Sequence, residues 1–341
     1  MNKRRNKSSK SVNLKAKEFV IVRPRKIFYF ISFCSGMLLT LIIVHLITND
    51  SIITEISHIP SLSELLSFNS EEIEQVDIAL MNLICTQGLI GSEDLDIDQC
   101  LGILDEWADL VHKDTNARLP AYYQNPQKYH NSVNKFKCAN LILTLKNTLK
   151  MDYNLEIMQT TDFLDSKNFF IHGCLTGKKQ GGCISIPITC VAVGRRLGYP
   201  LKLALTREHV FFRWEDDHEV FNMEACCPGC DSHPDEYYQT WPNKLTDADV
   251  ALYGYLKSLT PAEELALFLD TRGHCLLDSG NITEALMCYA QAYLLMPDAP
   301  DLLAHLNQAV QQEYDKFQKL ESNLKQNKNV TVQAFRPEIS E

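Results

Sequence analysis

The sequence predicts an α+β fold in which one cysteine-bearing helix packs on a small antiparallel sheet, with helical regions before and after it. An apolar run from Ile184 to Leu197 has the composition of a buried helix with a marked start and stop. Three short strand-like segments follow, at Leu201 to Thr206, His209 to Trp214 and Glu219 to Ala225. Apolar residues at spacings of three and four on either side of this region favour further helices.

The predicted helix carries a cysteine at its N-terminus. Gly181 and Gly182 precede Cys183 in the sequence. Pro187 falls in the first turn, where a missing N–H costs little, and Gly198 can close the helix in the left-handed conformation. Unpaired N–H groups and the helix dipole at such a start favour the thiolate, the nucleophilic form of cysteine. Cys183 is therefore a candidate nucleophile, and a buried structural cysteine is the alternative interpretation.

The predicted strands supply a base for this thiol. Alternation places His209 and Phe211 on the same face of the second strand. If the turn-like stretch 215–218 is an even-length hairpin loop, it sets Phe211 opposite Asn222 and His209 opposite Glu224. Asn222 is then the diagonal neighbour of His209 on the sheet.

These residues together match the pattern of a thiol acyl-transfer site. Cys183 is the predicted nucleophile, His209 the base and Asn222 the group that orients the imidazole. An amide can orient the ring but lends no negative charge to the imidazolium, so Glu224 stays the alternative orienting residue. Gln180, three residues before the nucleophile, is a candidate side-chain donor to an oxyanion.

Five motifs carry a family resemblance, namely GGCISIP, RRLGYPLKL, EHVFFRW, FNMEA and DEYYQTWP. Together they resemble the transglutaminase-like superfamily over residues 151–245. The resemblance implies a papain-like thiol fold whose catalytic Cys, His and Asp occur in that order. Position 222 departs from this pattern, because it carries Asn, as papain-like enzymes do.

The N-terminal region predicts a membrane anchor. Residues 1–26 form a basic tail, and residues 27–47 are an uncharged run long enough to cross a bilayer as a helix. No Lys or Arg occurs between Lys26 and Lys113, so the positive-inside rule places the tail in the cytoplasm and the main domain in the periplasm or at the cell exterior. The length of the run and the lack of a cleavage motif favour an uncleaved signal anchor. Residues 48–70 are a predicted Ser-rich linker.

The next region, residues 71–150, is predicted to be helical, at Glu71 to Ile90, Ile97 to His112 and Asn134 to Lys150. A row of acidic residues between the first two helices mimics a calcium loop. Its sixth position is Gln99, where calcium loops carry Gly, so we expect helix capping by Asp96 or Asp98 instead.

Residues 246–324 are predicted to form helices that resemble one tetratricopeptide repeat. The large, small and terminating positions of that repeat fall on Leu269, Gly273, Leu276, Ala285, Tyr289, Ala292 and Pro297. We expect flanking helices at Asp247 to Ser258 and Asp301 to Leu320, because one helix pair cannot bury its own apolar face. The repeat either packs on the enzyme domain or offers a groove to a protein partner. Residues 325–341 are a predicted disordered tail.

The net charge and the cysteine content of the chain restrict which ligands and partners it is expected to bind. The net charge is −10 even with the basic tail included, which disfavours nucleic-acid binding. Cys226, Cys227 and Cys230 form the one dense group among 12 cysteines. Local disulfides, a zinc site and plain thiols are all compatible with it. Since one Cys-x-x-Cys pair supplies only two of the four ligands that zinc normally needs, we predict no metal and no cofactor.

Two hypotheses on function follow. The first is a membrane-anchored, transglutaminase-like thiol enzyme that transfers or hydrolyses the acyl group of an amide or peptide substrate. The second is an inactive module of the same fold that binds a peptide, glycan or protein partner at the membrane. Convergence of Cys183, His209 and an orienting residue in space distinguishes the two.

Overall fold

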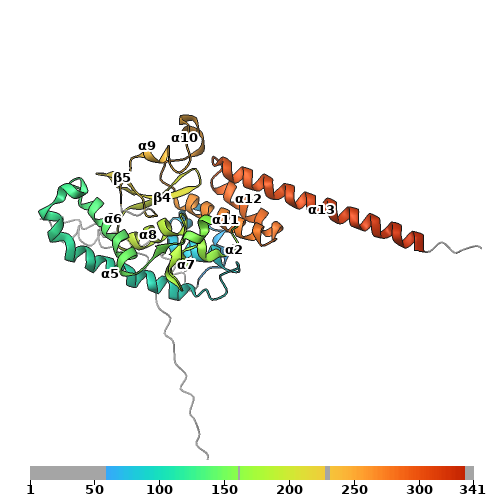
Figure 1. Ribbon diagram of the computed structural model, residues 1–341, viewed down its shortest axis with the longest axis horizontal. Helices are drawn as coiled ribbons and strands as arrows, with labels where there is room; N and C mark the ends of the chain where they lie inside the picture. The colour runs from blue at the N-terminus through green and yellow to red at the C-terminus, as the bar shows by residue number, and fades with distance from the viewer. Residues whose placement is uncertain (1–58, 160–161, 227–230, 335–341) are drawn as a thin grey trace, which may run out of the picture. The chain divides into compact units, whose positions relative to one another are not determined.

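The computed structural model describes residues 59–159, 162–226 and 231–334, and these have the predicted mixed α+β architecture (Figure 1). The predicted tail 1–26 and membrane span 27–47 lie outside the described residues. Within the described ranges, no helix is both long enough and apolar enough to span a bilayer.

Helices fill residues 71–150, as predicted, and a short helix lies before them. They are α2 (Leu62–Leu65), α3 (Ser70–Ile73), α4 (Ile78–Thr86), α5 (Ile97–Gln124) and α6 (Val133–Leu143), with the short turns η1 (Pro126–Tyr129) and η2 (Thr144–Thr148). Leu65 is fully buried, so the packed fold begins inside the predicted linker. The predicted first helix is split because Asp77 caps a new start, accepting from the N–H groups of Ala79 and Leu80. Asp96 caps α5 in the same way, which confirms capping in the calcium-like segment.

The central helix α8 (Ser185–Arg196) lies within one residue of the predicted run at each end and is buried over most of its length. Gly198 has a φ of 75°, and the N–H of Tyr199 donates to the carbonyl of Gly194, which is a Schellman ending. The helix packs against the sheet on one side and against α5 and α7 on the other (Figure 1). This position explains why its sequence is apolar all round.

Short elements lead into α8. They are the parallel pair β1 (Asp152–Tyr153) and β2 (Gln180–Gly181), the turns η3 (Leu155–Gln159) and η4 (Ser166–Asn168), and α7 (Ile171–Leu175). The pairing of β1 with β2 fixes the chain immediately before Cys183.

The sheet has the predicted antiparallel order of three consecutive strands. These are β3 (Leu201–Thr206), β4 (His209–Glu215) and β5 (Val220–Met223). The predicted register between β4 and β5 is wrong, because Asn222 lies opposite Arg213 and not opposite Phe211. This register places Glu224, just after β5, level with Phe211 and diagonal to His209.

Asp216 causes the shift in register. Its Oδ1 accepts from the backbone N–H groups of His218 and Glu219, and its Oδ2 accepts from the indole N–H of Trp214. Asp216 N–H in turn donates to the carbonyl of Glu219. The four-residue loop therefore spans residues 216–219 and not 215–218, which moves every pair by one position on each strand.

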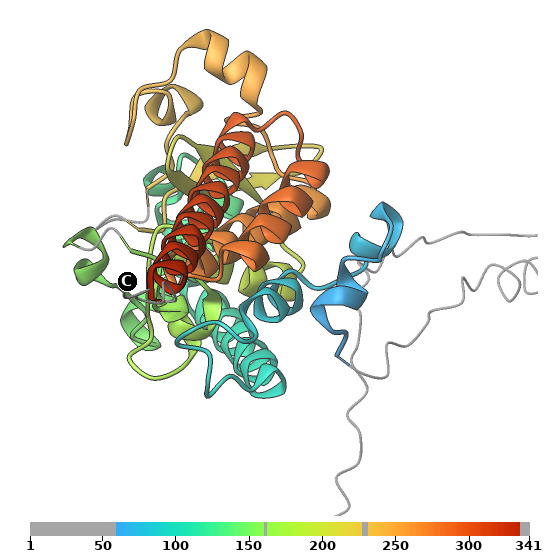
Figure 2. The ribbon, with the colours of Figure 1, turned by 90° about the vertical axis from the view of Figure 1, so that its right-hand side faces the viewer.

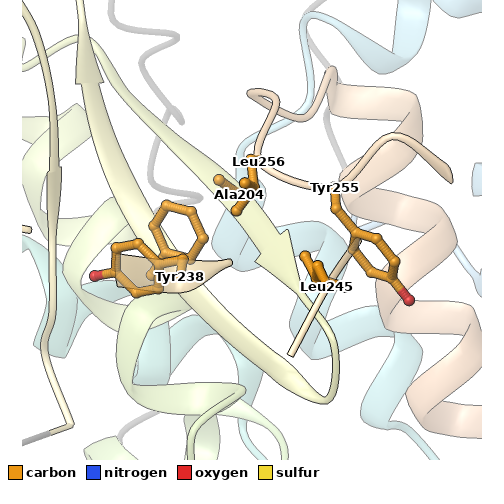
Figure 3. Packing of buried hydrophobic residues seen from close by; sticks show 6 residues of the cluster. Ala204, Tyr238, Leu245, Tyr255 and Leu256 are labelled. Carbon is orange, nitrogen blue, oxygen red and sulfur yellow. The ribbon is translucent and has the colours of Figure 1, made fainter. Parts of the chain in front are cut away.

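The outer face of the sheet is covered by the segment after the cysteine group, which contains α9 (Asp235–Tyr238) and α10 (Asp247–Tyr253). The rings of Phe211 and Tyr238 stack with centroids 3.8 Å apart. Figure 3 shows the buried cluster at this interface, made of Ala204, Phe211, Tyr238, Leu245, Tyr255 and Leu256. The predicted helix to Ser258 is wrong at its end, since Gly254 (φ 66°) stops it and Leu256 donates to the carbonyl of Leu205 beside the sheet.

Three long helices complete the fold: α11 (Pro261–Asp278), α12 (Ile282–Leu295) and α13 (Pro300–Ala334). Figure 2 shows α12 and α13 side by side in orange and red. A Cβ added to Gly273 would lie 2.5 Å from the Tyr289 ring, so the predicted small and large positions do pack on each other. The helix α13 continues to Ala334, past the predicted start of disorder at residue 325.

Buried charges join these helices to the core. Arg195 of α8 donates to both carboxylate oxygens of Glu264 on α11, which is fully buried. Arg272, also on α11, donates to the carbonyls of Cys85 and Gln87 at the end of α4. The repeat-like helices are therefore packed on the core, as one of the two alternatives for this region requires.

Candidate active site

Cys183 lies in the turn that opens α8. The N–H of Ile186 donates to the carbonyl of Gly182, so the first turn already includes the cysteine. Its side chain is half-buried. The predicted placement of this thiol at a helix start is confirmed.

The two glycines before Cys183 lie where the surrounding atoms leave no room for a side chain. A Cβ on Gly181 would lie 2.4 Å from both the Cys174 sulfur and the Ser185 hydroxyl. The N–H of Gly182 donates to the Ser185 Oγ at 2.9 Å, and that hydroxyl donates to the carbonyl of Asn168. Ser185 thus fixes the approach to the cysteine, a role that the sequence analysis did not assign to it.

His209 opens β4 and is buried. Its Nε2 lies 2.8 Å from Oε2 of Glu224, and the Cys183 side chain lies within hydrogen-bonding reach of the same imidazole. The edge of the Trp241 ring packs on it, with centroids 4.7 Å apart. Because Glu224 engages Nε2, Nδ1 is the ring nitrogen left for the thiol.

Glu224 is fully buried and uses both carboxylate oxygens. Oε2 faces His209, and Oε1 accepts the backbone N–H of Cys226 at 2.8 Å. The backbone N–H of Glu224 donates to the carbonyl of Asp231, which ties the residue to the chain beyond the cysteine group. The carboxylate is thus held in one orientation toward the imidazole.

The surroundings favour the charged form of His209. Burial alone lowers the pKa of a histidine, but the hydrogen bonds to Cys183 and Glu224 and the Glu224 charge outweigh it and raise the pKa of His209 to about 9. At neutral pH the ring is therefore an imidazolium between the Cys183 side chain and the Glu224 carboxylate.

Asn222, the first-choice orienting residue, lies elsewhere. Its Oδ1 accepts from Arg213 Nε at 2.6 Å, and its Nδ2 donates to Asp235 Oδ1 and to the carbonyl of His233. The shifted register takes it away from His209 and gives the diagonal position to Glu224. It lines a surface pocket with Arg213, Phe221 and Asp235, among others.

Gln180 lies in β2, paired with Asp152, and is half-buried. Among the described residues its side chain has no hydrogen-bond partner. The structure gives no contact between Gln180 and the thiol. The N–H of Ile186 donates to Gly182 and Pro187 has no N–H, so the candidate backbone donors to an oxyanion are the N–H groups of residues 183–185.

The predicted cysteine group is only partly described, because Cys227 and Cys230 lie outside the described residues. Cys226 is a neighbour of the site. Its Sγ lies 4.0 Å from the carbonyl of Gly182, and its N–H donates to Glu224. Neither this contact nor the packing of Trp241 on His209 follows from a sequence pattern, since both depend on how the chain returns over the sheet.

Other described thiols are in a different environment. Six of them are free, buried, and have pKa values that burial raises above the ordinary range, namely Cys85, Cys100, Cys138, Cys174, Cys275 and Cys288. For Cys100 and Cys174 the pKa is raised to about 11. These thiols stay protonated at neutral pH, and none of them contacts His209.

Comparison of the chain with protein families, with curated proteins and with solved structures found no match. The geometry of Cys183, His209 and Glu224 is therefore the main indication of function in this protein.

Proposed function

We propose that this protein is a transglutaminase-like thiol enzyme that transfers or hydrolyses the acyl group of an amide or peptide substrate. One observation carries the proposal: a half-buried cysteine at a helix start and a buried carboxylate contact the same imidazole. The order Cys183, His209, Glu224 along one helix and two strands also agrees with the order that the sequence resemblance implies, with Glu224 as the acid.

The chemistry follows from the charges. The Cys183 thiolate attacks the carbonyl carbon of the amide and forms a C–S bond, while the carbonyl electrons move onto oxygen. The His209 imidazolium then gives its proton to the departing amine as the C–N bond breaks, which leaves a thioester. Water or a second amine attacks the thioester with His209 as the base, and the thiolate leaves.

Two features lower the barriers of these steps. Glu224 holds the ring through Nε2 and stabilises its positive charge. Backbone N–H groups of the first turn of α8 can donate to the oxyanion, because helix starts lack intrahelical acceptors. No metal or cofactor enters this scheme.

The proposal also covers location and partners. We propose a signal anchor at residues 27–47, because this run is uncharged. We propose that the enzyme domain is extracytoplasmic, because Lys and Arg are concentrated on the N-terminal side of this run. Protease added outside intact cells should then digest the chain beyond residue 50 and spare residues 1–26. The tetratricopeptide-like helices are proposed to contact a protein partner, and the support is the repeat-like spacing of Leu269, Gly273 and Tyr289 in the sequence.

Alkylation of the detergent-solubilised full chain tests the proposal. Iodoacetamide should label Cys183 faster than any of the six buried thiols, and His209→Ala should slow that labelling by about 100-fold. Incubation with amide-containing peptides should give a mass increase on Cys183 that Cys183→Ala lacks. If Cys183 reacts no faster than the buried thiols, and its rate is unchanged in His209→Ala, the protein is not a thiol enzyme and the inactive-module hypothesis replaces it.

A further inference from the structure

A second group of chemically active side chains lies away from the thiol site, between α11 and α13. Asp270 and His274 are one turn apart on α11, and His305 reaches them from α13. One potential ligand atom from each residue lies within 4.8 Å of the other two. We propose that Asp270, His274 and His305 form a binding site for a divalent transition-metal ion.

The distances between these side chains fit a hydrogen bond on one side of Asp270 and a ligand-to-ligand separation on the other. His305 Nδ1 lies 2.8 Å from Asp270 Oδ1, which is a hydrogen bond. His274 Nε2 lies 3.7 Å from Asp270 Oδ2, which is too long for one. Ligand atoms at ~2.0–2.2 Å from a tetrahedral ion are roughly 3.3–3.6 Å apart, so a small movement of each side chain encloses the ion.

The surroundings orient His274 for this role. Tyr289 Oη lies 3.1 Å from His274 Nδ1, and Phe163 stacks on the ring with centroids 4.7 Å apart. Metal-binding histidines commonly have the second ring nitrogen held by such a partner, which fixes the tautomer. Among the described residues, Nε2 of His274 has no hydrogen-bond partner, so it is available to a metal.

The exposure of the three side chains also agrees with metal binding. The three side chains are 15% to 27% exposed, which leaves one side open for an ion to enter and for a water ligand.

The ligand set indicates which ion. Two imidazoles and one carboxylate suit zinc, nickel, cobalt or ferrous iron, whereas calcium and magnesium prefer oxygen ligands alone. A bound ion joins α13 to α11 and so anchors the terminal helix. The proposed metal site shares no residue with the thiol centre, so a test of metal binding is independent of a test of the proposed activity.

Cobalt titration of the full chain tests the site, because the absorption spectrum of the ion distinguishes nitrogen and oxygen ligands from thiolates. Wild-type protein should bind one cobalt ion with a spectrum free of thiolate charge-transfer bands. His274→Gln and His305→Gln should each weaken binding by at least about 100-fold. His112→Gln, which changes an exposed histidine on α5, is the matched control and should bind as wild type does.

Calorimetric titration with nickel provides a second readout on the same variants, with circular dichroism to verify that each is folded. Absence of binding by folded wild-type protein overturns the proposal. Binding that is unchanged in His305→Gln, or a cobalt spectrum that shows only thiolate ligands, also overturns it and locates the ion at the cysteines instead.

Discussion

The Nε2 atom of His209 lies 2.8 Å from the Oε2 atom of Glu224, and both side chains are buried. A buried carboxylate next to a buried imidazole stabilises the imidazolium, because water is excluded and the local dielectric is low. The pair therefore sets the charge of the ring that contacts Cys183. This geometry favours Glu224, and not Asn222, as the orienting residue of the proposed site.

Glu224→Gln should slow the alkylation of Cys183 at neutral pH on the order of 10²-fold, because the amide keeps the shape but removes the charge that favours the imidazolium. The measurement is the rate of iodoacetamide labelling at Cys183, followed by mass spectrometry.

Asn222→Ala is the comparison for this variant. It removes the contacts to Arg213 and Asp235, which do not involve His209, so it should lower stability while the folded protein keeps a labelling rate within about threefold of wild type. Equal labelling rates for Glu224→Gln and wild type, with a large loss in Asn222→Ala, would return the orienting role to Asn222.

The pH dependence of stability should report the same pair. The pKa of His209 is raised from 6.5 to about 9 by the hydrogen bonds to Cys183 and Glu224. The folded state thus holds this proton more tightly than the unfolded state does. The resulting stabilisation is fully present below pH 6.5 and is lost as the pH rises through about 9.

A shift of this size corresponds to about 3 kcal/mol at most. Urea denaturation across this pH range should show the free energy of unfolding falling with pH in the wild type, and falling less in Glu224→Gln. A wild-type curve that rises through the same window contradicts the assignment of the imidazolium.

The error in the register shows what the sequence could and could not determine. Alternation and the turn-like stretch 215–218 predicted the three strands and their order, because these are local features. The side chain of Asp216 then set the position of the four-residue loop by taking two backbone N–H groups and the Trp214 indole. Moving the loop by one position along the chain places Glu224, and not Asn222, beside His209, and hydrophobic spacing carries no information on that choice.

Gly273→Ala should destabilise the protein by about 1–3 kcal/mol, because the new Cβ would lie 2.5 Å from the Tyr289 ring. Gly102→Ala is the matched control on α5, where an added Cβ meets nothing within 4 Å. It should stabilise by up to about 1 kcal/mol through helix propensity. Thermal denaturation of both variants measures these effects. A stabilising Gly273→Ala would show that α11 and α12 do not pack closely at Gly273 and Tyr289.

Helix boundaries were predictable where packing or caps mark them and not elsewhere. Gly198 and Pro187 marked both ends of α8, and the spacing from Leu269 to Ala292 marked α11 and α12. In contrast, α5 continues beyond His112 and through Pro120, where the exposed residues have no amphipathic pattern. The contacts of α11 with α4 and α8 were also unpredictable, since they join residues far apart in sequence.

The buried pair of Arg195 and Glu264 should be the strongest of these long-range links. Arg195→Met leaves the fully buried Glu264 carboxylate without its partner, so it should cost about 3–5 kcal/mol in the free energy of unfolding. Arg195→Met combined with Glu264→Leu removes both charges and should be more stable than Arg195→Met alone.

Lys325→Ala, which breaks an exposed pair with Glu321, is the control and should change stability by less than about 0.5 kcal/mol. Urea denaturation measures these three variants and the single variant Glu264→Leu. A double variant whose loss equals the sum of the two single losses would mean that the charges are not coupled, and that α8 and α11 are held together by apolar contacts alone.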